Sequence, residues 1–412
     1  MKWSFWLTLA FSKNLVDGAA CSYSTLPTPI LVADTNCYGL NASVCGVDPT
    51  CKVINSELKN TYYEFGGFNS VGDMTSYTQD YLAISNTSSV NLKLMRLPIT
   101  VISLIFRHIT KLDLIQIKTT LPDTLTALSF VNTSLGVIPT DFKWPEKLFT
   151  VVLRVVELQN IPRNLPIGLS ELAIQGNYLK DLNYLPSGLT FLNLAGNELT
   201  EISTVDLRSV TFLALSNNPL TTFSFVQLSG SLQYFSCDNC SLSNITVNAA
   251  TYAALNALPA WDRDTSADTY VGYTLNKRVT ANPTACQAIG GTVKPLWASS
   301  STYPISACVV ASAASTTSTT KPSSTPSQAP APVPVPAGNE SSNSSSNNTA
   351  MIIGIVVGVI GVIGIIGAVI IVKRRNQQQT QFEDYQTNYV DVNAQYRYDP
   401  NYNDNTGNSS LK

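Results

Sequence analysis

The sequence predicts an α/β solenoid, in which a parallel sheet coils along a repeat between disulfide-closed caps, followed by one transmembrane helix. An eleven-residue pattern of leucines with one asparagine recurs through the middle of the chain, cysteines flank it on both sides, and residues 350–372 carry no charged or hydrogen-bonding side chain. We expect these segments in chain order: 1–20 signal peptide, 21–84 N-terminal cap, 85–247 repeats, 248–309 C-terminal cap, 310–349 stalk, 350–372 membrane span and 373–412 cytoplasmic tail.

The charge and the histidine content of the chain exclude or disfavour several classes of function. The 412 residues carry 27 acidic and 25 basic side chains, and a net charge of −2 excludes the basic surface of a nucleic-acid-binding protein. His108 is the only histidine, and no serine or cysteine nucleophile motif accompanies it. We therefore expect neither an enzyme nor a cofactor.

The N-terminus is typical of a secretory signal. Met1 and Lys2 precede an apolar run over residues 3–11, which is too short to span a bilayer, and small residues at 18–20 predict cleavage after Ala20. The alternative is a buried first helix, because Lys13 and Asp17 interrupt the segment before the cleavage site.

Residues 350–372 are expected to cross a membrane, since 23 helical residues reach about 34 Å against a hydrocarbon core of ~30 Å. Lys373, Arg374 and Arg375 follow directly, which predicts a single-pass type I protein of the plasma membrane with an extracellular N-terminus. Gly354 and Gly358 form a G-x-x-x-G that favours a homo- or hetero-dimer, with a lipid-facing helix as the alternative. Residues 310–349, rich in Ser, Thr and Pro, read as an O-glycosylated stalk.

All eight cysteines precede the predicted membrane span, on the side expected to be extracellular, and this placement is typical of an oxidising compartment. Cys286 and Cys308 are expected to pair, and Cys21, Cys37, Cys45 and Cys51 to form two further disulfides with three connectivities open. Cys237 and Cys240 form a C-x-x-C, but the repeat places Cys237 in an inward apolar position and Cys240 in the asparagine position, which we favour over metal or redox chemistry. N-glycosylation is expected at Asn41, Asn86, Asn132, Asn244, Asn339, Asn343 and Asn347. Asn239 is expected to be poorly accessible beside a buried Cys240.

The repeat follows the pattern L-x-x-L-x-L-x-x-N-x-L. Its best units begin at Leu169, Leu189 and Val210, with asparagines at 177, 197 and 218. A unit from Leu232 has Cys240 in the asparagine position, units from Leu148 and Leu125 have Val156 and Thr133 there, and fainter units are placed at Ile109 and Ser89. Prolines 122, 145, 166 and 186 each lie three residues before a leading apolar residue. Eight strands ~4.7 Å apart would give about 35 Å of sheet.

This pattern resembles the leucine-rich-repeat family over residues 85–247, with a Leu-Pro-x-x-Leu spacing similar to its short-repeat classes. The resemblance implies one strand per unit, stacked into a parallel sheet, with the asparagines binding backbone groups where the chain turns. With its signal, stalk and span, the chain resembles leucine-rich-repeat receptor-like proteins. It also resembles the ectodomain, stalk and anchor of protist receptor kinases of the tyrosine-kinase-like group, without the kinase.

The concave face of this sheet is the expected binding surface. The third position of successive units reads Thr150, Glu171, Phe191, Phe212 and Tyr234, so three aromatic rings would stack there. In the alternative, the C-terminal cap around Trp261 or Trp297 folds back over them. The predicted ligand-binding residues are Arg154, Gln175, Phe191, Asn193, Phe212 and Tyr234.

These expectations together predict a cell-surface recognition protein that acts as receptor or co-receptor without catalysis. Its partners would be the membrane and an extracellular protein, peptide or glycan ligand. The alternative is a structural protein of adhesion or cell-wall contact, with no signalling role.

Overall fold

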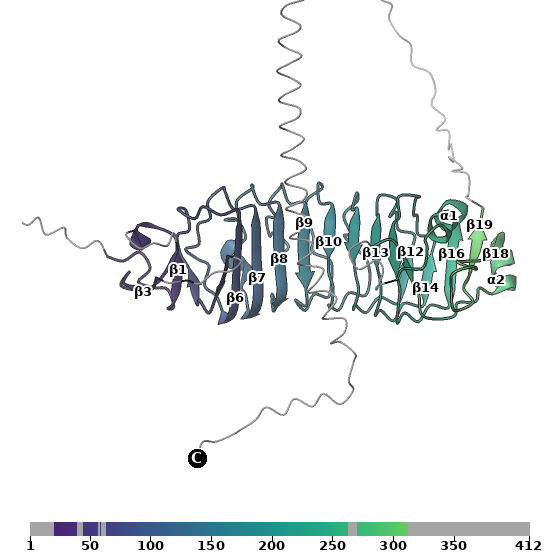
Figure 1. The fold of residues 1–412 in the computed structure, drawn as a ribbon, viewed down its shortest axis with the longest axis horizontal. Helices are drawn as coiled ribbons and strands as arrows, with labels where there is room; N and C mark the ends of the chain where they lie inside the picture. The colour runs from purple at the N-terminus through teal and green to yellow at the C-terminus, as the bar shows by residue number, and fades with distance from the viewer. Residues whose placement is uncertain (1–19, 39–43, 57, 59–62, 263–269, 312–412) are drawn as a thin grey trace, which may run out of the picture. The chain divides into compact units, whose positions relative to one another are not determined.

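The computed structural model describes residues 20–38, 44–56, 58, 63–262 and 270–311 (Figure 1). The chain divides into two compact units, Met1–Thr316 and Thr317–Lys412, and all described residues belong to the first. The sequence-predicted stalk from residue 312, the membrane span and the tail lie outside the described residues, as do residues 1–19 of the predicted signal peptide.

The described residues form a β-solenoid whose main feature is a ten-stranded parallel sheet, here called the long sheet. Its strands in chain order are β4 (Glu64–Gly66), β6 (Tyr81–Ser89), β7 (Ser103–Lys111), β8 (Ala127–Thr133), β9 (Thr150–Arg154), β10 (Glu171–Ala173), β11 (Phe191–Asn193), β13 (Phe212–Ala214), β15 (Tyr234–Ser236) and β17 (Gly272–Thr274). Strands β4 and β17 extend the sheet beyond the predicted repeats, into the segments expected to be caps.

A second sheet, here called the short sheet, corrects the predicted α/β class. Its strand order is β12 (Glu201–Ser203), β14 (Thr222–Ser224), β16 (Asn244–Asn248), β19 (Ser306–Val310) and β18 (Gly291–Pro295). The described residues contain only two α-helices, α1 (Ala249–Asn256) and α2 (Pro283–Ala288), and two 3₁₀ turns, η1 (Thr35–Cys37) and η2 (Leu114–Ile117). The return segments alternate short polar and apolar residues, as in Thr222-Phe223-Ser224, and so form strands where helices were expected.

The predicted membrane topology is also corrected. No helix among the residues that the structure describes is long and apolar enough to cross a bilayer, which contradicts the expected location as a single-pass type I protein of the plasma membrane. Residues 350–372, on which that expectation rested, lie outside the described residues.

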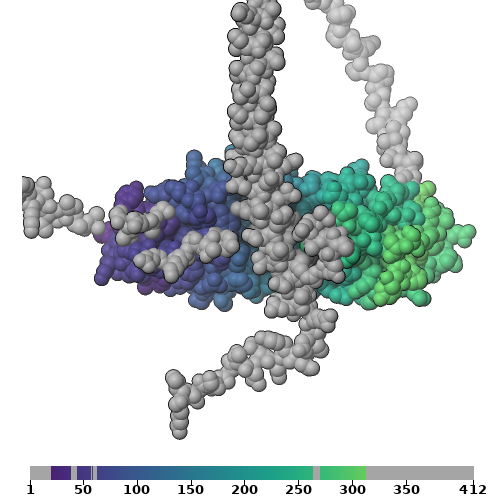
Figure 2. Space-filling model, in the orientation of Figure 1, coloured from purple at the N-terminus to yellow at the C-terminus, as the bar shows by residue number. Residues whose placement is uncertain are grey.

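Disulfides close both ends of the first unit, as the sequence predicted. The N-terminal cap is a four-stranded sheet with the order β3 (Val53–Asn55), β2 (Cys45–Val47), β1 (Ile30–Val32) and β5 (Ser70–Val71). Bonds Cys21–Cys51 and Cys37–Cys45 resolve the connectivity that was left open, and Cys286–Cys308 joins α2 to β19. Cys237 and Cys240 are bonded to each other, a pairing that the repeat register had not indicated. Figure 2 shows the purple N-terminal cap and the green C-terminal cap at opposite ends of this unit.

The asparagine ladder predicted from the repeat is confirmed. Asn177, Asn197 and Asn218 are all buried, and each side chain binds backbone groups of the preceding coil. The amide of Asn197 accepts from the Leu179 N–H (3.1 Å) and donates to the carbonyls of Ile174 (2.7 Å) and Leu194 (2.9 Å). Because buried backbone groups need partners, this residue type fixes the turn that follows each strand.

The phase of the first repeats differs from the prediction. Leu104 of β7 pairs with Leu128 of β8, so the leading residue of that unit is Val101 and not Ile109. Val101 donates its N–H to the Pro98 carbonyl (3.2 Å), the same turn that Leu125 forms with Pro122 (3.1 Å). Pro98 was the sequence signal for this phase, because it lies three residues before Val101 as the other four prolines lie before their leading residues.

Candidate functional site

The outer face of the long sheet, predicted as the concave face, carries the predicted site. Strand pairing aligns Thr150, Glu171, Phe191, Phe212 and Tyr234 in one column across β9, β10, β11, β13 and β15. Residues between them in sequence, such as Leu172 and Leu192, point into the core and are fully buried. This alternation follows from the period of two in a strand, so the column lies on the face away from the core.

The aromatic part of the column is stacked and covered. The ring centroids of Phe191 and Phe212 lie 4.2 Å apart, and those of Phe212 and Tyr234 lie 4.7 Å apart. Tyr270 packs edge-on against Phe212 (5.5 Å), and Trp261 packs edge-on against Tyr234 (5.7 Å). We call these five residues the aromatic cluster. Phe212 and Tyr234 are only 8% and 6% exposed, so their rings offer little free surface to a ligand.

A short backbone pairing positions Trp261 in this cluster. Residues 259–261 run along the edge of β17: Tyr273 donates its N–H to the Pro259 carbonyl (2.9 Å), and Trp261 donates its N–H to the Tyr273 carbonyl (3.0 Å). Gly272 allows this approach, because a Cβ atom there would lie 2.7 Å from the Pro259 oxygen. The other candidate for covering the column, Trp297, is instead buried against the ring of Tyr273 (3.9 Å).

The polar part of the same face begins where the aromatic cluster ends. Thr150, Arg154, Glu171 and Gln175 are half-buried on the adjacent strands or directly after them, and we call these four residues the polar strip. Phe191, also half-buried, lies between this strip and the covered rings. Asn193, the remaining predicted residue, is 2% exposed and accepts the Ala195 N–H (3.1 Å), so its role is structural.

Glu171 is the central group of the polar strip. Thr150 donates its hydroxyl to Glu171 Oε2 (2.7 Å), and burial raises the pKa of the Glu171 carboxyl despite this hydrogen bond. Burial also raises the pKa of Asp238, which lies on the same face two residues after β15. Two desolvated carboxyl groups on one sheet face are unusual in a chain with only 13% charged residues.

His108 takes no part in this site. It lies within β7, where its side chain is largely exposed, and its Nδ1 lies 2.9 Å from Asn132 Nδ2. Partial burial and the neighbouring Arg107 lower the pKa of His108. Within the described ranges, no group of three or more His, Cys, Asp or Glu side chains could hold a metal ion.

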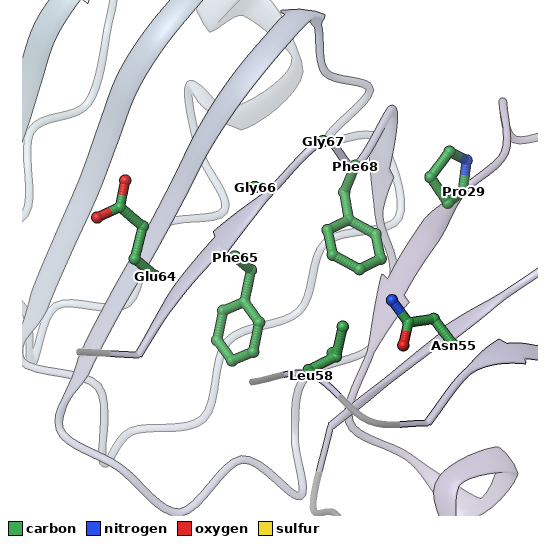
Figure 3. Close-up of a pocket in the computed structure, with 8 residues that line it drawn as sticks. All are labelled: Pro29, Asn55, Leu58, Glu64, Phe65, Gly66, Gly67 and Phe68. Carbon is green, nitrogen blue, oxygen red and sulfur yellow. The ribbon is translucent and has the colours of Figure 1, made fainter. Parts of the chain in front are cut away.

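Two hollows lie away from the polar strip. The first, of about 290 Å³, lies beside β4 (Figure 3). Its lining residues are Pro29, Asn55, Leu58, Glu64, Phe65, Gly66, Gly67 and Phe68. Its one carboxylate, Glu64, forms an ion pair with Arg107 (3.5 Å). The second, of about 540 Å³, lies beside α1 and is lined mainly by alanine, proline and serine residues together with Tyr252 and Trp297. Neither hollow brings together groups that would perform chemistry.

Comparisons with known proteins add no relative to this picture. No family model matches the chain, and a search of curated proteins found no match.

Proposed function

We propose that this protein is a non-catalytic recognition protein of the leucine-rich-repeat type, which binds a protein, peptide or glycan ligand on the outer face of the long sheet. The polar strip and the half-buried ring of Phe191 would form the contact surface. Three of these contact residues were already predicted from the sequence, namely Arg154, Gln175 and Phe191. The structure adds two more candidates for ligand contact, Thr150 and Glu171.

The observation that carries this proposal is the placement of Glu171. At the equivalent position of β11, β13 and β15 the chain has an aromatic ring that packs against its neighbours, so stacking of the coils does not require a carboxylate there. Burial of the Glu171 carboxyl disfavours its charged form, which is a cost in stability at neutral pH. Costs of this kind concentrate at functional sites.

The chemistry of the surface supports a ligand rich in hydrogen-bonding groups. The polar strip combines a carboxylate, a guanidinium, an amide and a hydroxyl, and the ring of Phe191 adds an apolar contact beside them. Planar polar side chains next to an aromatic ring can orient a sugar or a peptide while they exclude water from one of its faces.

The test compares two matched substitutions on opposite sheets. Three proteins are applied to arrays of defined oligosaccharides and peptides: the native protein, the Glu171→Gln variant and the Glu201→Gln variant. The amount of each protein that binds is quantified. Glu201 is exposed at the start of β12 on the short sheet, so its substitution serves as the control. We expect Glu171→Gln to weaken capture at least tenfold and Glu201→Gln to leave it unchanged. Equal capture by all three proteins would contradict the proposal.

A further inference from the structure

Successive coils of the solenoid carry a residue with positive φ at one position, within or shortly after the strand of the long sheet. Strand pairing aligns these residues in one column, here called the left-handed column: Asn86, His108, Asn132, Val155, Gly176, Gly196, Asn217 and Asn239. Their φ angles range from 46° to 68°. Glycine and asparagine adopt this conformation at least cost, so the backbone favours these two residue types along this edge.

Three of the four described glycosylation motifs lie on this edge. Asn86, Asn132 and Asn239 belong to the left-handed column and are exposed, and Asn244 follows five residues after Asn239 at the start of β16. Among the described residues, no Asn-x-Ser/Thr motif occurs on the opposite edge, where the chain returns through turns such as Pro122–Leu125.

Asn239 is accessible, contrary to the sequence-based expectation. Cys240 is fully buried, but Asn239 precedes it at the tip of the turn and is exposed, as is Ser241, the hydroxyl residue of the motif. The amide of Asn239 lies along the surface, where Nδ2 donates to Asn217 Oδ1 (2.8 Å) and Oδ1 accepts from Asn276 Nδ2 (3.1 Å). Adjacent positions point in opposite directions, so burial of the cysteine does not bury the asparagine.

We propose that Asn239 is a further N-glycosylation site, and that the edge formed by the left-handed column carries N-linked sugars at Asn86, Asn132 and Asn239. In the transfer, Asn239 Nδ2 forms a bond to C1 of an oligosaccharide carried on a lipid pyrophosphate. The bond from C1 to the phosphate oxygen breaks, the amide loses one proton, and the lipid pyrophosphate leaves. The modified nitrogen keeps one hydrogen, which suffices for the bond to Asn217 Oδ1.

The experiment maps sugar attachment in the full chain. The protein is produced in a eukaryotic secretory host and treated in ¹⁸O water with an amidase that converts each glycosylated asparagine to ¹⁸O-labelled aspartate, and its peptides are then weighed. We expect label at Asn239 in the native protein and its complete loss in Ser241→Ala, with the labels at Asn86 and Asn132 unchanged. Asn217 is an internal control, because Asn217-Asn218-Pro219 is no acceptor motif although the residue lies in the same column. An unlabelled Asn239 in the native protein would overturn the proposal, as would label that persists in Ser241→Ala.

Discussion

Substitution of Asn197 by alanine tests the asparagine ladder, which determines how one coil stacks on the next. The side chain is 5% exposed and forms hydrogen bonds with the Leu179 N–H and with the carbonyls of Ile174 and Leu194. Alanine removes all of these bonds and leaves the three backbone groups without that partner in a buried position.

The expected loss of stability follows from these groups. An unsatisfied buried N–H costs ~1–3 kcal/mol, and each lost hydrogen bond to a carbonyl costs ~0.5–1.5 kcal/mol. Because a carbonyl oxygen has a second lone pair, the total should be about 3 kcal/mol. In a solenoid each coil contacts only its neighbours, so a defect in the middle weakens coupling along the whole stack.

Urea unfolding followed by far-UV circular dichroism, with the disulfides intact, measures this loss. With an m-value of ~3 kcal/mol/M, Asn197→Ala should lower the midpoint by about 1 M. Asn183→Ala is the matched control, because Asn183 is exposed and its replacement should change stability by less than ~0.5 kcal/mol. A midpoint for Asn197→Ala that falls no further than that of Asn183→Ala would refute the role assigned to the ladder.

Three further predictions address other parts of the unit. Val155 is a β-branched residue in the left-handed column (φ 52°), so Val155→Asn should raise the melting temperature by ~2–4 °C, and Asn217→Val should lower it by a similar amount. Equal melting temperatures of the two variants in calorimetry would argue against backbone strain at this position. Cys240 is buried at the asparagine position of its coil and is bonded to Cys237. An asparagine side chain should therefore fit there, and the double variant Cys237→Ala/Cys240→Asn should fold and lose little stability. Failure to recover folded monomer would show that the disulfide is essential. Burial raises the pKa of Glu171 above its ordinary value, so the stabilising contribution of this group is present at acidic pH and is lost as pH rises through the folded-state pKa. Glu171→Gln should therefore gain stability relative to the native protein as pH increases, and parallel stability profiles of the two proteins would contradict this.

The sequence predicted the central coils well because their signals are local. Each of Asn177, Asn197 and Asn218 follows its strand at a fixed interval, and its hydrogen bonds reach no further than the neighbouring coil. The first coils were misaligned because Thr133 and Val156 occupy the asparagine position and strands such as β7 are apolar at several positions, so Ile109 was mistaken for a leading residue.

The candidate site was only partly predictable, because its decisive contacts are distant in sequence. The repeat register placed Phe191, Phe212 and Tyr234 in one column, as the structure has them. It could not decide whether the column is covered, since Trp261 reaches it through the backbone pairing with β17 that Gly272 permits. The importance of Glu171 also emerged only from its burial. In the sequence, an acidic residue at the same repeat position as Thr150 and Phe191 gives no signal that its carboxyl group is desolvated.

The most direct test of the account is the parallel register of the coils, measured by engineered cross-links. Thr211 donates its N–H to the Thr190 carbonyl (2.8 Å), and Gln233 in turn pairs with Thr211, so Thr190 and Gln233 lie two strands apart. Adjacent strands are ~4.8 Å apart, within the Cα separation that a disulfide spans, whereas two strand spacings exceed it. We expect Thr190→Cys/Thr211→Cys to form a fifth disulfide under mild oxidation, detected by mass and thiol counting, and Thr190→Cys/Gln233→Cys to keep two free thiols. Cross-linking of the second pair but not of the first would contradict the parallel solenoid described above.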